Sequence, residues 1–348
     1  MSFRVAVVGA GRMGKLHARV FSEMEQAELV CVVDVNLSAA EAVAKQRNCL
    51  ALSNVADAVD KVDAAIIAVP TLHHVAAARP FLGAGKAVLI EKPLAGSVAE
   101  GEELVALAKA NGTTVQVGHT ERFNPAFLAV QKYAIEPKFI EASRISPFTF
   151  RSADVGVVLD MMIHDLDLVL MMAGGQVEQV HAVGVNVIGQ HEDICNARLV
   201  FDNGCVANVT ASRLAIKTER KTRIFSEEAY VSVDYGKKAG IVIQKSRNLD
   251  LIQMAREADA EDLAELATSV DYTKLIKVEE LVVDDSCEPL RRQAEAFRRS
   301  VVEGERPVVS VDEGLAAVRC AHAIVESMRQ HRWDGSASER AGLDVIRK

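Results

Sequence analysis

The sequence lacks the cysteine pairs that mark a disulfide scaffold or a structural zinc site. Its six cysteines, in a chain of 348 residues, include no CxxC spacing, and most of them lie inside apolar runs. Zinc sites and small secreted domains depend on closely spaced cysteines. We therefore expect no metal site, and we expect reduced, buried thiols at Cys31, Cys49, Cys195, Cys205, Cys287 and Cys320.

Positive charge is scarce as well. Lysine and arginine together number 40 against 48 aspartates and glutamates, which gives a formal net charge of −8. A nucleic-acid-binding protein displaces counterions with a basic surface, so this balance argues against a nucleic-acid partner. It leaves an anionic small molecule possible, because a few arginines are enough to hold a phosphate.

Long apolar runs and a targeting segment are also missing. No apolar run reaches the ~20 residues that a transmembrane helix requires. The segment Met1-Ser2-Phe3-Arg4-Val5 leads directly into a predicted strand, with no basic-then-apolar leader. We expect no membrane partner and a cytoplasmic location.

What the sequence does have is a regular alternation of strands and helices in its first third. A chain of this length is expected to form two domains, and such alternation predicts a doubly wound parallel Rossmann sheet, assigned to residues 1–122. The predicted strands are 4–8, 29–33, 64–69, 87–90 and 113–117. The predicted helices run from the glycine-rich turn to about residue 25, then over 38–47 with Ser38 as N-cap, over 73–85, and over 97–111 with Gly112 after the last turn.

After about residue 123 the pattern changes to strands with few helices between them. Residues 123–348 are therefore predicted to form an α+β domain with a large, mostly antiparallel open sheet, for substrate binding and oligomerisation. Its predicted strands are 139–144, 177–188, 197–201, 205–212, 222–226, 229–233 and 239–244; its predicted helices are 125–133, 156–172, 288–302 and 312–329. The polar segment 248–274 is interpreted as an irregular excursion from the sheet edge.

The first turn carries a dinucleotide-binding pattern, Gly9-Ala10-Gly11-Arg12-Met13-Gly14, between a strand and a helix. Gly9 permits the tight turn, Gly11 lets the backbone approach a pyrophosphate, and Gly14 lets the helix pack on the strand. The N–H groups that begin the helix, at Arg12 and Met13, are placed to bind phosphate. Glycines also form ordinary turns, so the prediction depends on the strand and the helix around them.

The choice of dinucleotide follows from Asp34, which ends the second predicted strand. A carboxylate at this point accepts hydrogen bonds from the adenosine ribose hydroxyls and repels a 2′-phosphate. The next residues, Val35 and Asn36, supply no arginine for such a phosphate. We predict NAD as the cofactor rather than NADP.

A first catalytic candidate stands at Glu91-Lys92-Pro93, where a buried strand ends. Ligands of open α/β sheets bind beyond the carboxyl ends of the strands, so Lys92 is predicted to point into the cleft. Pro93 restricts Lys92 to an extended backbone and so fixes its direction. Taken alone, the tripeptide is equally typical of a lysine on the surface.

A second constellation lies in the predicted helix over 156–172. With α-helical spacing, Asp160, His164 and Asp167 share one polar stripe, beside an apolar stripe of Leu159, Met162, Ile163, Leu166 and Leu170. A lone histidine on a helix is usually structural. One flanked by carboxylates in an NAD-binding chain is a better acid/base candidate, because its ordinary pKa of about 6.5 suits proton transfer near neutrality.

These groups together suit the oxidation of a secondary alcohol. NAD takes the hydride, His164 takes the hydroxyl proton, and Lys92 stabilises negative charge on the reacting oxygen. Asp160 orients the substrate by accepting from a neighbouring hydroxyl. Lys92 with a pKa lowered by burial is an alternative base.

The motifs in combination resemble the glucose–fructose oxidoreductase, inositol 2-dehydrogenase and MocA family over nearly the whole chain. The matching motifs are Gly9 to Gly14, Val69-Pro70-Thr71-Leu72-His73-His74, Glu91-Lys92-Pro93, Arg122-Phe123-Asn124-Pro125 and Asp160-x-x-x-His164-Asp165. The resemblance implies that Lys92, Asp160 and His164 are catalytic. It also implies that Pro70, Thr71, His74 and Glu91 line the NAD pocket, although position 71 is often asparagine in the family. Members are commonly dimers or tetramers, so it implies a homodimer or homotetramer formed through the second sheet.

Within that family, residues 118–125, 156–167 and 223–230 resemble the UDP-N-acetylglucosamine 3-dehydrogenases. The resemblance implies oxidation of a sugar 3-hydroxyl to a ketone, a step toward the amino sugars of lipid A-type molecules. A nucleotide-sugar diphosphate needs cations, and the candidates for substrate binding are Arg122, Arg151 and Arg223, with Asn124 in the first of these motifs. Arg220 and Lys221 are further candidates, and a solvated strand edge explains the 220–223 cluster equally well.

Two other functions fit the same residues. The chain is alternatively a dehydrogenase of a free sugar, inositol or another polyol. A non-catalytic NAD-sensing protein with a dehydrogenase fold is the alternative from another class, and the presence of both Lys92 and His164 argues against it.

Overall fold

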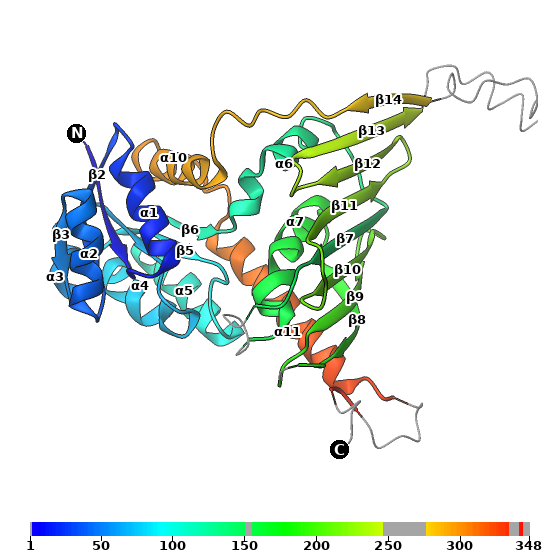
Figure 1. Cartoon of the computed structure of the whole chain (residues 1–348), viewed down its shortest axis with the longest axis horizontal. Coiled ribbons are helices and arrows are strands. Elements are labelled where there is room, and N and C mark those ends of the chain that lie inside the picture. Colours follow the sequence, from blue (N-terminus) through cyan, green and yellow to red (C-terminus); the bar gives the residue numbers. More distant parts are fainter. Residues whose placement is uncertain (1, 150–154, 189, 246–275, 334–340, 344–348) are drawn as a thin grey trace, which may run out of the picture.

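The computed structural model describes residues 2–149, 155–188, 190–245, 276–333 and 341–343, and these form two sheets with helices between them (Figure 1). The first sheet is parallel and has the strand order β3-β2-β1-β4-β5-β6. This is the doubly wound dinucleotide-binding order, whose crevice lies where the order reverses between β1 and β4. Its strands are β1 Phe3–Val8, β2 Ala27–Val33, β3 Leu50–Leu52, β4 Ala64–Ile67, β5 Ala87–Glu91 and β6 Val115–Gly118. The predicted Rossmann sheet is confirmed, with β3 as a strand that the prediction missed.

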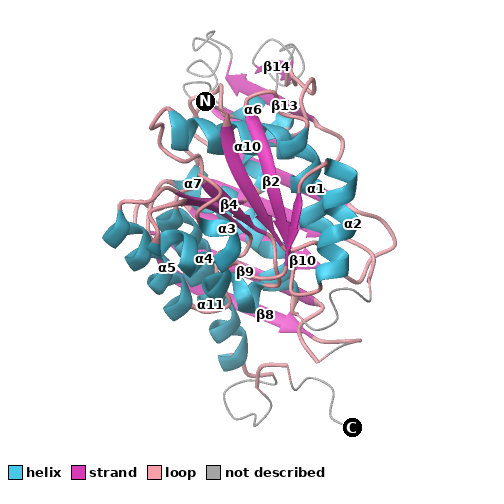
Figure 2. Ribbon diagram, turned by 90° about the vertical axis from the view of Figure 1, so that its left-hand side faces the viewer, coloured by secondary structure: helices cyan, strands magenta, loops and turns pink. Residues whose placement is uncertain are grey.

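Helices cover both faces of this sheet (Figure 2). They are α1 Arg12–Ser22, α2 Leu37–Arg47, α3 Ala56–Val59, α4 His74–Gly83 and α5 Val98–Asn111; the short α3 was not predicted. Ser97 caps α5 in a capping box with Glu100, and Gly112 follows in the left-handed conformation, as expected. The predicted cap of α2 was wrong: Asn36, not Ser38, accepts a hydrogen bond from the Ala39 N–H.

The second sheet has eight strands in the order β14-β13-β12-β11-β7-β10-β9-β8. All its neighbours are antiparallel except β7 and β10, which confirms a mostly antiparallel sheet. The strands are β7 Phe139–Ile145, β8 Val177–Val185, β9 Ile194–Phe201, β10 Val206–Ser212, β11 Glu219–Phe225, β12 Ala229–Asp234, β13 Ala239–Lys245 and β14 Ile276–Glu280. Strand β14 was not predicted, and the predicted excursion over 248–274 lies outside the described residues.

Helices cover the face of this sheet that looks toward the first one (Figure 1). They are α6 Pro125–Val130, α7 Ile163–Ala173 and α11 Val311–Gln330. The strand burial alternates accordingly: in β9, Cys195, Ala197 and Leu199 are buried while Ile194 and Asn196 are exposed. The outer face of the sheet therefore carries no helix among the described residues.

The last two helices return to the first sheet. The apolar side of α10, Pro289–Val302, packs through Leu290, Ala294 and Phe297 with Phe3 and Val5 of β1. The sequence prediction placed this segment with residues 123–348, whereas its core is shared with the parallel sheet. Helix α11 contacts α5 beside the parallel sheet, and α7 and β8 of the second sheet. It therefore joins two units, each built around one of the two sheets, through one continuous core.

Two further features bear on the sequence predictions. Among the described residues, no helix is both long and apolar enough to cross a membrane. All six cysteines are free; Cys31, Cys195, Cys205 and Cys320 are buried, whereas Cys49 and Cys287 are only half-buried.

Candidate active site

A cavity of about 1470 Å³ lies at the carboxyl ends of the parallel strands, lined by residues of both units. The first unit contributes the turn after β1, the loops after β4 and β5, and Gly118 at the end of β6. The second contributes the end of β7, the segment before α7, and Arg220 of β11. Single ligands usually occupy pockets of about 300–1,000 Å³, so this cavity has room for more than one.

The glycine-rich turn has the geometry of a phosphate cradle. Gly9 has φ +106°, and a Cβ there would lie 2.5 Å from the carbonyl oxygen of Ala68. A Cβ on Gly14 would lie 1.7 Å from the carbonyl oxygen of Gly9, so helix and strand can meet only without one. A Cβ on Gly11 would meet no protein atom within 4 Å, so the space beside it is left for a ligand. Arg12 and Met13 begin α1 and line the cavity.

Asp34 lies beside this turn. One of its carboxylate oxygens accepts the Ala10 N–H at 2.7 Å, and the other accepts the Asn36 N–H at 2.9 Å. Both bonds use main-chain donors, which hold the carboxylate at the end of β2. The arrangement fits the role of a ribose acceptor. The next two residues, Val35 and Asn36, carry no positive charge that could hold a 2′-phosphate.

The loop after β4 divides the predicted cofactor contacts. Pro70, Thr71 and Leu72 line the cavity, and Leu72 is 78% exposed. His74 does not line it. Its ring is buried, with Nδ1 3.3 Å from the Leu94 carbonyl oxygen and Nε2 3.1 Å from that of Val69. A neutral imidazole has one N–H, so the ring donates to one of these two carbonyls and packs between two loops of the cavity wall.

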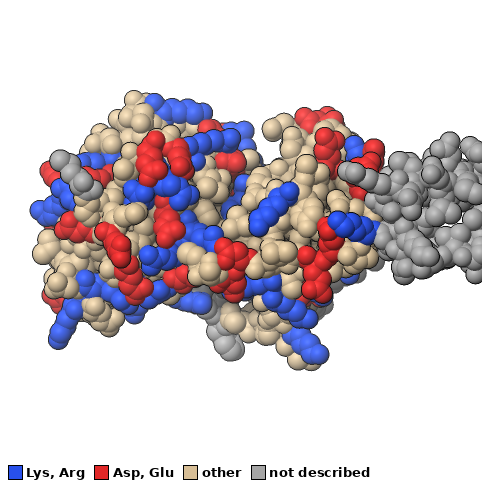
Figure 3. All heavy atoms as spheres, turned by 90° about the horizontal axis from the view of Figure 1, so that it is seen from above, with Lys and Arg blue, Asp and Glu red and all other residues tan. Residues whose placement is uncertain are grey.

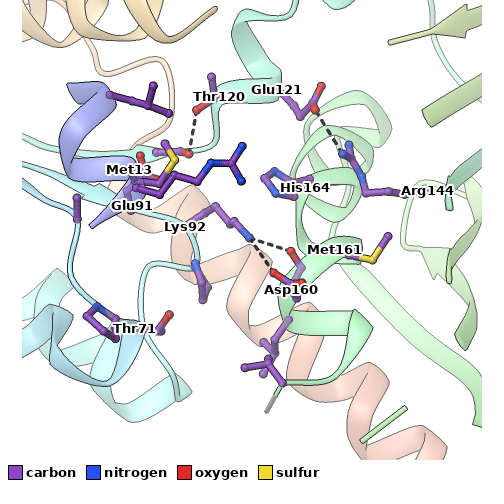
Figure 4. A pocket seen from close by; sticks show the side chains of 18 of the residues that line it. Met13, Thr71, Glu91, Lys92, Thr120, Glu121, Arg144, Asp160, Met161 and His164 are labelled. Carbon is purple, nitrogen blue, oxygen red and sulfur yellow. Dashed lines mark hydrogen bonds and ion pairs between the residues drawn. The ribbon is translucent and has the colours of Figure 1, made fainter. Parts of the chain in front are cut away.

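Glu91 ends β5 and Lys92 follows it, and both line the cavity (Figure 4). Oε1 of Glu91 lies 2.6 Å from Nε2 of His17, a fully buried residue of α1 that packs against Phe21. The sequence shows no partner pattern for His17, which is expected to be a structural or surface residue; in the structure it holds the carboxylate next to Lys92. The peptide bond between Lys92 and Pro93 is cis.

Asp160 lies in a π-helical turn, Val158–Met162, that precedes α7. Lys92 Nζ donates to the main-chain oxygen of Asp160 at 2.8 Å and lies 3.7 Å from its Oδ1. The predicted polar stripe is present only in part: Asp160 and His164 line the cavity, whereas Asp167, one turn further along α7, is buried and paired with Arg122. Extra turns of this kind are frequent at functional sites.

His164 and Lys92 point into the same space from different units (Figure 4). Nδ1 of His164 is buried and has no hydrogen-bond partner among the described residues. Burial first, and then the charges of Lys92 and Arg144, hold the pKa of His164 well below its ordinary value. The imidazole is consequently neutral near pH 7 and able to accept a proton. Burial also lowers the pKa of Lys92, although Asp160 and Glu91 oppose this.

The predicted substrate cations lie elsewhere. Arg122 is buried and donates to both carboxylate oxygens of Asp167, at 2.6 and 2.9 Å. Asn124 is buried as the N-cap of α6 and donates to Glu121 and to the Tyr235 carbonyl. Neither lines the cavity. Arg122 therefore ties the segment after β6 to α7, and Asn124 ties the start of α6 to Tyr235. Arg151 lies outside the described residues.

Arg223 is directed to the outer face of the second sheet. In β11, Thr222 and Ile224 are buried, so Arg223 between them points away from the cavity, where it pairs with Glu141 at 3.4 Å. Arg220 lies three residues earlier and therefore has the opposite direction. Arg220 lines the cavity. The alternation of inward and outward residues along the strand was the sequence signal that could have distinguished Arg220 from Arg223.

Sequence reasoning also missed a buried charge cluster beside His164. Arg144 of β7 donates to both oxygens of Asp165, at 2.7 and 2.9 Å, and to Glu121 at 3.3 Å. Ile140 and Ala142 precede Arg144 on the buried face of the same strand. An arginine in register with apolar core positions was the available signal for this cluster.

The arginine pairs of α10 have a simpler explanation. Arg291, Arg292, Arg298 and Arg299 form ion pairs with Glu295, Asp284, Glu303 and Glu305, respectively. Basic and acidic side chains alternate over the face of the molecule seen from above, where α10 lies (Figure 3). These arginines are therefore paired with carboxylates on the surface of α10 and its flanks rather than gathered into an anion site.

The site fits NAD. The open space beside Gly11, the beginning of α1 and the fixed carboxylate of Asp34 suit a pyrophosphate and a ribose, respectively. Pro70, Thr71, Leu72 and Glu91 would line the rest of its path toward Lys92. Bound NAD would accept a hydride, while proton transfer is left to side chains of the protein.

Comparisons with known proteins agree with this geometry. Residues 3–119 match the oxidoreductase family with an NAD-binding Rossmann fold, and residues 137–232 match the GFO/IDH/MocA C-terminal domain. Over 233 residues the chain is 36% identical to UDP-N-acetylglucosamine 3-dehydrogenase of Acidithiobacillus ferrooxidans, which covers 67% of this chain and 74% of that protein. It is 26% identical over 347 residues to inositol 2-dehydrogenase of Rhizobium meliloti, covering 95% and 98%.

The fold agrees as well. A solved structure of the Acidithiobacillus ferrooxidans enzyme superimposes with a TM-score of 0.82 and 28% identity, over 94% of this chain and 98% of that one. The resemblance inferred from the motifs is therefore confirmed in both units. The chain belongs to the Gfo/Idh/MocA family of NAD-binding oxidoreductases.

Proposed function

We propose that the chain oxidises a secondary hydroxyl of a sugar with NAD, and that the substrate is UDP-N-acetylglucosamine, converted at its 3-hydroxyl to a 3-keto nucleotide sugar. The observation that carries the chemistry is the meeting of Lys92 and His164, from separate units, in one cavity beside the dinucleotide turn (Figure 4). The sugar is proposed from the 36% identical relative, and the size of the cavity supports a second large ligand beside NAD.

In the proposed reaction His164 is the general base. Its neutral imidazole takes the proton of the substrate hydroxyl while the hydrogen on the same carbon leaves as hydride. Lys92 donates to the oxygen and stabilises its growing negative charge. The side-chain carboxylate of Asp160 lies beside Lys92 and would accept from a neighbouring hydroxyl, which fixes the sugar ring.

To test this, the purified chain is screened with NAD against UDP-sugars, free sugars and inositols, and NADH formation is monitored by its absorbance. NADH should appear with UDP-N-acetylglucosamine, and mass spectrometry should show a product that has lost two hydrogens. A UDP-sugar with no hydroxyl at carbon 3 should give no NADH. Turnover of inositols without turnover of UDP-sugars would overturn the proposed substrate.

That second outcome has support of its own. The inositol 2-dehydrogenase of Rhizobium meliloti aligns over almost the full chain, although at lower identity. A polyol dehydrogenase would use the same Lys92, Asp160 and His164 but would require no cation for a diphosphate. Absence of hydride transfer across the whole panel would instead favour an NAD-sensing protein.

We further propose that the outer face of the second sheet joins copies of this chain into a homodimer or homotetramer. Phe139, Phe225 and Tyr230 form an aromatic cluster on that face, with ring centroids 5.7 and 5.0 Å apart. Val183, Ile194 and Val278 are exposed on the same sheet. Apolar surface left open in this way is typical of association sites.

Sedimentation of wild type and Phe225→Asp tests the proposed association. The variant should dissociate, and a monomeric wild type would exclude the proposed oligomer.

A further inference from the structure

Arg220 differs from the other arginines that the second unit places in the cavity. Arg144 is held by Asp165, and Arg213 donates to Asp193 at 2.6 Å and to the Val155 carbonyl at 2.7 Å. The guanidinium of Arg220 makes no hydrogen bond to any described residue. Its nearest carboxylate oxygen, in Glu121, lies 3.7 Å away, and its side chain is 47% exposed. Arg220 therefore keeps donors on its guanidinium that no described residue uses.

The strand fixes the direction of this side chain. Arg220 pairs with Arg144 in the register between β11 and β7, on the face where Thr222 and Ile224 are buried. This face looks toward α7 and the cavity. Arg220 therefore lies next to the charge cluster of Arg144, Asp165 and Glu121 beside His164. The side chain can turn further into the cavity without losing a hydrogen bond, and it gives up only the 3.7 Å ion pair with Glu121.

Glu121 does not neutralise Arg220 fully. Its carboxylate already accepts from Arg144 at 3.3 Å and from Asn124 at 3.2 Å. One carboxylate is thus shared between two guanidinium groups, and the exposed one keeps its donors for a ligand. A planar guanidinium matches two oxygens of a phosphate or a carboxylate.

The position of Arg220 favours the substrate over the cofactor as its partner. The dinucleotide turn with Met13 lies on one side of Lys92 and His164, and Glu121 and Arg144 lie on the other (Figure 4). Arg12 lines the cofactor side. If NAD binds along the dinucleotide turn, an anion near Glu121 and Arg144 would belong to the substrate.

We propose that Arg220 binds the anionic group of the substrate and makes the enzyme select a nucleotide sugar, through its diphosphate, over neutral sugars and polyols. The inference rests on the proposed oxidation of a sugar hydroxyl in this cavity. A sugar acid could offer a carboxylate to the same guanidinium, so the test separates the two anions.

The experiment compares the full-length wild type with Arg220→Met, Arg220→Lys and Arg223→Met, all with NAD bound. Arg223 is the matched control, because it stands on the same strand with similar exposure but on the opposite face. Calorimetry with UDP and with glucuronate measures anion binding without turnover. Steady-state rates are then measured with UDP-N-acetylglucosamine and free N-acetylglucosamine.

Arg220→Met should weaken UDP binding and raise KM for the UDP-sugar by about 10- to 100-fold, the range typical of hydrogen bonds to a charged group. Its kcat/KM for the free sugar should stay near that of wild type. Arg220→Lys should recover part of the loss, and Arg223→Met should bind UDP as wild type does. Glucuronate binding that depends on Arg220, with no binding of UDP, would assign the site to a sugar acid instead.

Two further outcomes overturn the inference: UDP binding unchanged in Arg220→Met, or equal losses with the UDP-sugar and the free sugar. Failure of the proposed function has a different result. If UDP binds in an Arg220-dependent manner and no UDP-sugar is oxidised, the anion site is present and the proposed reaction is wrong. Thermal unfolding of the Met and Lys variants near the wild-type temperature, expected for a half-exposed pair, shows that they are folded.

Discussion

The end of the cavity nearest the parallel sheet is shaped by backbone, whereas the end nearest the second sheet is shaped by charged side chains. In the first, Gly9, Gly11 and Gly14 set the space and main-chain N–H groups fix Asp34. At the second, Arg144 of the cavity lining is paired with Asp165, and Arg122, which does not line the cavity, is paired with Asp167. Backbone rules act locally, so the first end could be predicted from a short motif. The second depends on partners 21 to 45 residues apart.

The largest expected effect tests the point where the two ends meet. Lys92→Ala and His164→Ala should each lower kcat by about 10²- to 10⁴-fold, the usual contribution of a positioned acid/base or oxyanion group. NAD affinity, measured by calorimetry, should change little in His164→Ala, because His164 comes from the second unit. Wild-type turnover in either variant would remove that residue from the proposed mechanism.

The next test asks whether Arg122 is structural. Removing one partner of a buried ion pair leaves an uncompensated charge, which costs about 3–5 kcal/mol. Arg122→Ala should therefore lower the free energy of unfolding by about that amount, measured in urea, whereas Arg223→Ala should change it by about 0–1 kcal/mol. If Arg122→Ala were as stable as wild type and raised only the KM for substrate, the substrate role expected from its motif would be supported.

Two glycine substitutions test the backbone end. Gly14→Ala places a Cβ 1.7 Å from the Gly9 oxygen, so the turn must move, and stability should fall by about 1–3 kcal/mol together with NAD affinity. Gly11→Ala meets no protein atom and should unfold as wild type does, yet bind NAD at least tenfold more weakly, about 1.4 kcal/mol. Calorimetry and thermal unfolding of both variants separate the two effects. Equal NAD affinity in Gly11→Ala would show that the pyrophosphate lies elsewhere.

The same contrast explains what the sequence could and could not reveal. The parallel sheet, the dinucleotide turn and the cavity position of Lys92 and His164 follow from local patterns and were predicted. The π-helical turn at Asp160 was not, because nothing in the residues 158–162 distinguishes it from an α-helical turn. Arg122 and Asn124 were assigned to substrate since a motif shows residue types and not their partners. Arg220 could have been separated from Arg223 by the alternation of the strand alone.

The smallest expected effect compares buried histidines at the two ends through pH. Burial lowers the pKa of His74 and of His164; carbonyl groups of Leu94 and Val69 oppose this at His74, whereas nearby cations add to it at His164. The unfolded chain takes up protons near pH 6.5 that the folded chain does not bind. Stability should therefore be fully present above that pH and fall as the pH drops below it.

Urea unfolding at pH 7.5 and 5.5 measures the loss. His164→Gln should reduce it more than His74→Gln, because the folded pKa of His164 is lowered further. A greater reduction in His74→Gln would show that the cations beside His164 are screened by solvent, and that its end of the cavity is more open than the charge cluster indicates.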